Sequence, residues 1–154
     1  MSAASTTHTG RSYSTSYTVD QSPEAVFAAI LDVASWWTGE VEGRADEVGA
    51  EFTYRHPPQH YSRQRVAALE PGRRVAWQVT DSHLSFVSEP AEWTGSEIVF
   101  DLVPAPGGTE LRFTHVGLVP DVECFGACST AWLHYIDGSL RSRIITGEGL
   151  PDPW

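Results

Sequence analysis

Three polar residues, His56, Asp81 and His115, each fall at the end of a run of alternating apolar residues. Alternate residues of a strand share a face, so we expect these side chains to point toward the core with their apolar neighbours. A buried polar group without a partner costs about 1–3 kcal/mol. An imidazole near a carboxylate is a candidate general acid–base pair. The pattern is therefore compatible with satisfied core histidines and with histidines that orient or transform a ligand.

Large aromatic residues share the predicted inward faces with these polar groups. A mostly apolar lining with a few placed polar groups is typical of a small-molecule site. We predict a pocket whose rings supply contact area while two histidines orient a polar group of the ligand. The predicted ligand-binding residues are Tyr54, His56, Trp77, Phe100, His115 and Trp132. No catalytic set is predicted; a cyclase, dehydratase or hydrolase that uses His56 or His115 near Asp81 is the enzymatic alternative.

Other chemistries have less support in the sequence. His56 and His60 flank two prolines that make an extended loop, and a metal site needs three or four converging ligands, so no metal is predicted. Neither a nucleophile elbow nor a phosphate-binding loop is present, and no cofactor is predicted. Cys124 and Cys128 lie four apart on a predicted helix, and we expect buried, reduced thiols in a cytoplasmic protein.

Composition predicts one acidic domain. The chain has 154 residues, with 20 acidic against 10 basic side chains, and a net charge of −10. Such a charge disfavours nucleic acid and anionic membranes as partners, because both require a basic surface. No apolar run approaches the length of a membrane span. We expect residues 1–10 to be a polar lead and residues 11–154 to form the domain, with a small ligand as partner and a homodimer possible.

The last third of the chain, residues 120–154, is predicted to form one long helix. At 100° per residue its apolar residues occupy one half of the helix, and His134, Asp137 and Arg141 occupy the other. Gly147 is expected to stop the helix. The predicted apolar half consists of Phe125, Cys128, Trp132, Leu133, Tyr135, Ile136, Leu140 and Ile144.

Strands fill most of the chain before this helix. Residues 11–19 alternate as a strand, and Ser22-Pro23-Glu24 is a helix start with an N-cap and a proline at the first position. About six further strands are predicted between Glu40 and His115, with the stretch Ser82 to Gly95 unassigned and a candidate lid. This order indicates an α+β fold in which an antiparallel sheet curls around the long helix and encloses a cavity.

Two parts of the chain also resemble a known family. The segment from Glu123 to Trp132, with Tyr135 to Arg141 and Thr146 to Gly149, resembles the terminal helix of the START-like superfamily, in particular its bacterial SRPBCC branch related to the activator of Hsp90 ATPase (AHSA1-like). Tyr17 to Val19 and Ser22 to Phe27 are similar to that family's first strand and helix.

The resemblance runs from about Ser12 to Pro151 and implies a helix-grip fold, with a curved sheet of six or seven strands around the last helix and an apolar tunnel. Members bind lipids, hormones or polyketides, and a few are cyclases or hydrolases. They share no catalytic set, so no catalytic residue is carried over. An interaction module of the Hsp90-activator type is a third alternative. Its eukaryotic examples carry a further amino-terminal domain, for which this chain is expected to have no room.

Overall fold

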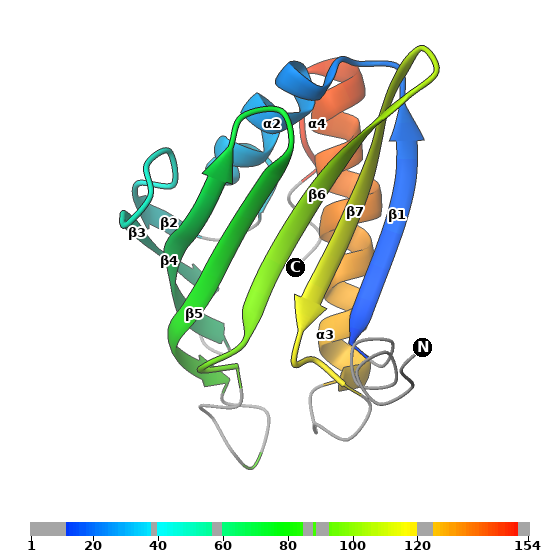
Figure 1. Cartoon of the computed structure of the whole chain (residues 1–154). Helices are drawn as coiled ribbons and strands as arrows, with labels where there is room; N and C mark the ends of the chain where they lie inside the picture. The colour runs from blue at the N-terminus through cyan, green and yellow to red at the C-terminus, as the bar shows by residue number, and fades with distance from the viewer. Residues whose placement is uncertain are drawn as a thin grey trace, which may run out of the picture.

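The computed structural model describes residues 12–37, 40–56, 60–84, 88, 93–119 and 125–150, and it leaves the side chains of residues 56 and 60 undescribed. Within these ranges the chain forms a seven-stranded antiparallel sheet and a small set of helices (Figure 1). The strands are β1 (Tyr13–Val19), β2 (Glu40–Gly43), β3 (Glu51–His56), β4 (His60–Glu70), β5 (Arg74–Leu84), β6 (Glu97–Ala105) and β7 (Gly108–Val116). The helices are α2 (Pro23–Leu31), η1 (Val33–Ser35), α3 (Phe125–Trp132), η2 (Leu133–Leu140) and α4 (Arg141–Thr146).

The sheet has the order β1-β7-β6-β5-β4-β3-β2, so the first strand pairs with the last and the six others form a meander. In Figure 1 the sheet curves across the C-terminal helix, and α2 lies beside the end of that helix. Each central strand buries alternate residues on the inner face, as in β7, where Leu111, Phe113 and His115 are buried. The predicted α+β helix-grip fold, with its strand number and element order, is confirmed.

The predicted start of α2 is also confirmed. The hydroxyl of Ser22 accepts a hydrogen bond from the backbone N–H of Ala25 at 3.2 Å, and Pro23 occupies the first helical position. The cap satisfies one of the free N–H groups of the first turn. The following 3-10 turn then brings Trp36 and Trp37 into the core, where their side chains are 0% and 2% exposed.

The C-terminal helix is continuous from Phe125 to Thr146 but changes its winding at Leu133–Leu140, which is a π-helix. In a π-helix each N–H bonds to the carbonyl five residues earlier, yet Tyr135, Ile136, Leu140 and Ile144 are buried as the wheel of 100° per residue predicted. Leu133, which we placed on the apolar half, is 54% exposed. The predicted stop is confirmed, because Gly147 adopts a left-handed conformation with φ of 91°.

The orientation of Asp81 also differs from the prediction. Its parity with Trp77 and Val79 predicted an inward carboxylate, yet its side chain is exposed. Between β4 and β5 the register slips, with Arg63 opposite Asp81 but Gln64 opposite Val79. A bulge of this kind inserts one extra residue and reverses the alternation beyond it. Asp81 therefore faces solvent, and the next residue, Ser82, faces inward.

Candidate functional site

Five of the six predicted ligand-binding residues lie together between the sheet and the C-terminal helix, in one cluster of buried side chains. The side chain of the sixth, His56, lies outside the described part of the chain. The backbone register brings the strand residues together: Trp77 pairs with Ile98, and Ile98 with His115, so all three project from one row across the inner face. The five are Tyr54, Trp77, Phe100, His115 and Trp132.

Aromatic rings pack closely in this cluster. The rings of Trp37 and Tyr54 stack with their centroids 4.1 Å apart. The ring of Trp77 contacts that of Phe100 at 5.0 Å, and Trp132 lies 5.2 Å from Trp37. The planes of Trp36, Trp37 and Trp77 are nearly parallel, with interplanar angles of 5° to 10°. The middle of the cluster is therefore built from flat, apolar ring faces packed against one another.

His115 is completely buried and takes part in a chain of hydrogen bonds. The indole N–H of Trp132 donates to His115 Nδ1 at 3.0 Å, so Nδ1 carries no proton. The Nε2–H therefore donates to Ser96 Oγ at 2.8 Å, and the hydroxyl of Ser96 donates to the carbonyl of Trp93 at 2.6 Å. His115 is thus a neutral imidazole whose two nitrogens both have partners, and it fixes the Trp132 ring.

A row of polar side chains crosses the inner face of β4 and β5. Ser62 and Gln64 are completely buried, and Gln64 Nε2 donates to Ser62 Oγ at 2.6 Å. Ser62 lies opposite Ser82 on β5, which is also buried. The Ser82 hydroxyl is 2.9 Å from that of Thr94, whose side chain is exposed. We call Gln64, Ser62, Ser82 and Thr94 the polar track; it connects the buried core with the surface.

Two atoms beside the inner end of the polar track have no hydrogen-bond partner among the described residues. They are the acceptor Gln64 Oε1 and the donor Trp77 Nε1, and both side chains are 0% exposed. Turning the amide of Gln64 over would exchange the atom that bonds Ser62 and leave the other one unpaired. Buried polar side-chain atoms in proteins are nearly always paired, so each of these atoms requires an explanation.

Trp77 was predicted as a site residue from the sequence, but the polar track was not. The signal was present, because Ser62, Gln64 and Val66 share one parity of the weakly alternating strand β4. Val66 is the only large apolar residue on that parity, so the alternation is a weak signal of an inward face. The inward position of Ser82 was hidden by the bulge in β5.

The phenol of Tyr54 faces the C-terminal helix. Burial raises the pKa of Tyr54 far above its usual range, and the charge and hydrogen bond of Tyr135 raise it further. Tyr54 therefore stays a neutral phenol at any physiological pH, so it adds no negative charge to the cluster. Cys128 is buried on the same helix, while Cys124 lies outside the described residues.

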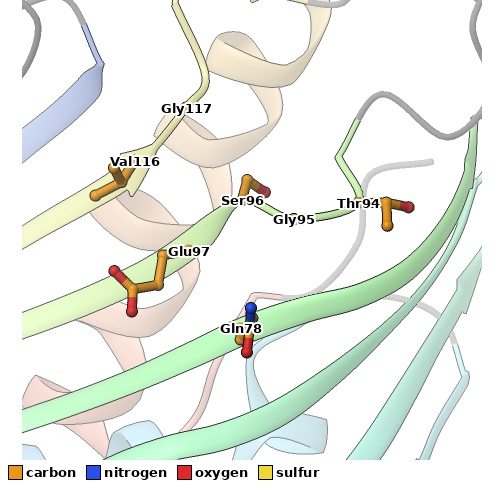
Figure 2. A pocket seen from close by; sticks show the side chains of 7 residues that line it. All are labelled: Gln78, Thr94, Gly95, Ser96, Glu97, Val116 and Gly117. Carbon is orange, nitrogen blue, oxygen red and sulfur yellow. The ribbon is translucent and has the colours of Figure 1, made fainter.

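A depression of about 470 Å³, shown in Figure 2, lies where β6 begins. It forms where β5 and β6 separate, since their pairing ends at Gln78 and Glu97. Thr94 and Ser96 line it, so it borders both the polar track and the His115 chain. Its full lining is Gln78, Thr94, Gly95, Ser96, Glu97, Val116 and Gly117.

The described residues contain no group of three or more His, Cys, Asp or Glu side chains that could hold a metal ion. In the same ranges, no helix is both long and apolar enough to cross a bilayer. The predicted lid can be followed only at its ends, because residues 85–87 and 89–92 lie outside the described part of the chain.

A known protein family matches the part of the chain that forms this fold. A model of the family "Activator of Hsp90 ATPase homolog 1-like protein" matches residues 20–143, which include α2, the whole meander and most of the C-terminal helix. The chain belongs to this family. No curated protein matches the chain significantly.

Solved structures of other members of this fold agree. The Aha1 dimer from Colwellia psychrerythraea is 27% identical, with a TM-score of 0.71 over 88% of this chain and 97% of that one. Protein SSP2350 from Staphylococcus saprophyticus is 18% identical, with a TM-score of 0.66 over 91% and 96%. Protein MLL2253 from Mesorhizobium loti is 20% identical, with a TM-score of 0.64 over 82% and 92%. The last two likenesses show the fold alone.

Proposed function

We propose that this family member binds a small molecule with a flat, apolar body between the inner face of β3–β5 and the C-terminal helix. The observation that supports it most directly is the pair of buried, unpaired atoms, Gln64 Oε1 and Trp77 Nε1. One accepts and the other donates, and each costs about 1–3 kcal/mol while it lacks a partner. A ligand that pairs with both atoms recovers this free energy when it binds.

The surroundings of these atoms fit such a ligand. Phe52 lies opposite Gln64 on the neighbouring strand, and its ring contacts that of Trp77 at 4.8 Å. Flat ring faces provide contact area at little conformational cost, while hydrogen bonds to the two polar atoms fix the orientation of the ligand. The polar track leads from this place to exposed Thr94 and suggests the direction from which a ligand enters.

The enzymatic alternative has weaker support. It required an inward Asp81 near a histidine, whereas Asp81 is exposed. His115 uses one ring nitrogen to accept from Trp132 and the other to donate to Ser96, so neither is available to a substrate proton. We therefore propose binding rather than turnover for the described part of the site.

A thermal-shift panel tests the proposal with progesterone, naringenin and dodecanol. A ligand present at 100 times its Kd stabilises a protein by about 2.7 kcal/mol, so we expect at least one compound to raise the melting temperature by several degrees. For naringenin or dodecanol, which carry hydroxyl donors, Gln64→Leu should remove much of this rise, because it removes the unpaired acceptor. Arg65→Leu is the matched control, since Arg65 is exposed on β4 and does not line the depression. A wild-type protein that no compound stabilises would contradict the proposal.

A homodimer is also proposed. The similar protein from Colwellia psychrerythraea is a dimer. Because two copies with a charge of −10 each repel one another, we expect association to strengthen when salt screens that charge. Sedimentation velocity at low and high NaCl concentration measures the association. A protein that stays monomeric at both concentrations would contradict the proposed dimer.

A further inference from the structure

Among the side chains that the structure describes, none on the inner face of the sheet carries a charge that could pair with an ionic ligand. In the described ranges no arginine, aspartate or glutamate is buried, and the chain contains no lysine. Arginines on β4 and β5 have partners away from the core: Arg63 bonds Thr80 and Arg74 pairs with Asp101, and both are partly exposed.

An anion placed in this cluster would therefore be buried without a counter-charge. The penalty for burying an uncompensated ion is several kcal/mol after relaxation. His115 does not offset it, because the hydrogen bond from Trp132 keeps its Nδ1 unprotonated. The net charge of −10 adds an unfavourable long-range field for anions.

The two unpaired atoms indicate which hydrogen-bonding groups the ligand carries in place of a charge. Gln64 pairs with Val79 and Val66 with Trp77, so Gln64 and Trp77 are diagonal neighbours on the inner face. Diagonal neighbours on paired strands lie roughly 7–8 Å apart, within reach of long side chains and of one small group between them. Gln64 Oε1 needs a donor and Trp77 Nε1–H needs an acceptor.

From this geometry we infer that the ligand is uncharged and presents a hydrogen-bond donor beside an acceptor, as in a carboxamide or a lactam. The inference rests on the proposed function and narrows it to a chemical class. A carboxylate of the same shape has two acceptors, no donor and a charge, so it satisfies only Trp77. A ketone likewise satisfies only Trp77 but without a charge.

Three probes of one shape test the inference on the wild-type protein: 2-naphthamide, 2-naphthoate and 2-acetonaphthone. Binding is followed by the indole N–H signal of Trp77 in 1H–15N spectra, assigned by its loss in Trp77→Phe. We expect 2-naphthamide to bind at least tenfold more tightly than 2-naphthoate at pH 7.5. The amide and the ketone should each shift the Trp77 N–H signal downfield, because each supplies its missing acceptor.

A variant separates the two hydrogen bonds. Gln64→Met keeps the length of the side chain and removes its acceptor, so the affinity for 2-naphthamide should fall about tenfold while that for 2-acetonaphthone stays the same. Arg65→Met, at the exposed neighbouring position on β4, is the matched control and should change neither affinity.

Each other result overturns the inference. If 2-naphthoate binds as tightly as 2-naphthamide, the uncharged class is wrong while the binding site itself stands. If Gln64→Met lowers the affinity for both neutral probes equally, Gln64 does not recognise the hydrogen-bond donor of the ligand. If no probe moves the Trp77 signal up to its solubility limit, the class is wrong, and the proposed function is judged on the thermal-shift panel alone.

Discussion

Single side chains in this protein show how burial selects protonation states. His115 stays neutral because the indole of Trp132 occupies the nitrogen that a second proton would need. Burial and the nearby charge of Asp137 raise the pKa of Tyr13 to about 12. Asp137 itself lies half-buried beside β1, where Oδ2 accepts from Thr15 Oγ1 at 3.0 Å and Oδ1 has no partner among the described residues.

Asp137 provides a pH-dependent test. Burial raises the pKa of Asp137 above its usual value, although the Thr15 hydrogen bond and the charge of Arg141 oppose the rise. The unfolded state therefore loses its proton first, near pH 3.9, and the protein loses stability as the pH rises from there through the folded pKa. Asp137→Asn should raise the free energy of unfolding at pH 7 by less than about 1 kcal/mol, because the group is partly exposed.

Urea unfolding at pH 3 and pH 7 measures this effect. The two proteins should differ least at pH 3, where Asp137 is protonated in both states. Glu42→Gln is the control, since it removes one negative charge from an exposed position on β2. An Asn variant that is less stable than the wild type at pH 7 would show that ionised Asp137 contributes favourably.

At the scale of the elements, residues 147–150, which follow α4, are held against another part of the fold. This segment returns onto the turn that follows α2, where the buried hydroxyl of Ser139 donates to the carbonyl of Trp36 at 2.7 Å. The same hydroxyl accepts from the backbone N–H of Leu150 at 2.8 Å. One side chain of the π-helix thus joins the end of the chain to the turn that places two tryptophans in the core.

Gly149 makes this contact possible. A Cβ atom on Gly149 would overlap the carbonyl oxygen of Ser35 and lie 3.0 Å from Trp36 Cα, and backbone atoms cannot move aside as a flexible side chain can. We expect Gly149→Ala to lower the free energy of unfolding by about 2–3 kcal/mol. Gly126→Ala is the matched control, because Gly126 is on α3 with open space around it; it should be neutral or stabilising by up to about 1 kcal/mol. Urea unfolding compares them, and equal stabilities would refute a close approach at Gly149.

At the scale of the whole molecule, charge and packing are separated in space. The buried residues are apolar apart from uncharged polar groups such as Ser62, Gln64 and His115, so the arginine, aspartate and glutamate side chains of the described part lie at or near its surface. Like charges on a compact surface repel one another and destabilise the folded state. The uncharged core is also what gives the proposed site its preference for neutral ligands.

Salt should therefore stabilise the protein in a pH-dependent manner. The sequence pI is about 4.9, so at pH 8 the molecule is strongly negative and at pH 5 nearly neutral. Raising NaCl from about 10 to 300 mM shortens the screening length from about 30 Å to well under 10 Å and should raise the melting temperature at pH 8. The rise should be much smaller at pH 5; calorimetry measures both. Equal rises at the two pH values would attribute the effect to something other than charge screening.

Much of this architecture was predictable from local patterns. Alternating apolar residues predicted the strands of the meander, the Ser22 cap predicted the start of α2, and Gly147 predicted the end of the long helix. These features depend on neighbouring residues alone. They were enough to place Tyr54, Trp77, Phe100, His115 and Trp132 in one cluster, because each lies on the apolar parity of its own element.

Tertiary structure decided the features that depend on distant partners. The bulge opposite Arg63 turned Asp81 outward and Ser82 inward, and a bulge arises from how two strands pair rather than from either strand alone. Packing also decided which edge of the predicted apolar half is covered, because Tyr135 is buried and Leu133 is 54% exposed. Gln64 and Trp77 are 13 positions apart in sequence; only strand pairing places their unpaired atoms on one inner face, and so only the fold could reveal the donor–acceptor pair.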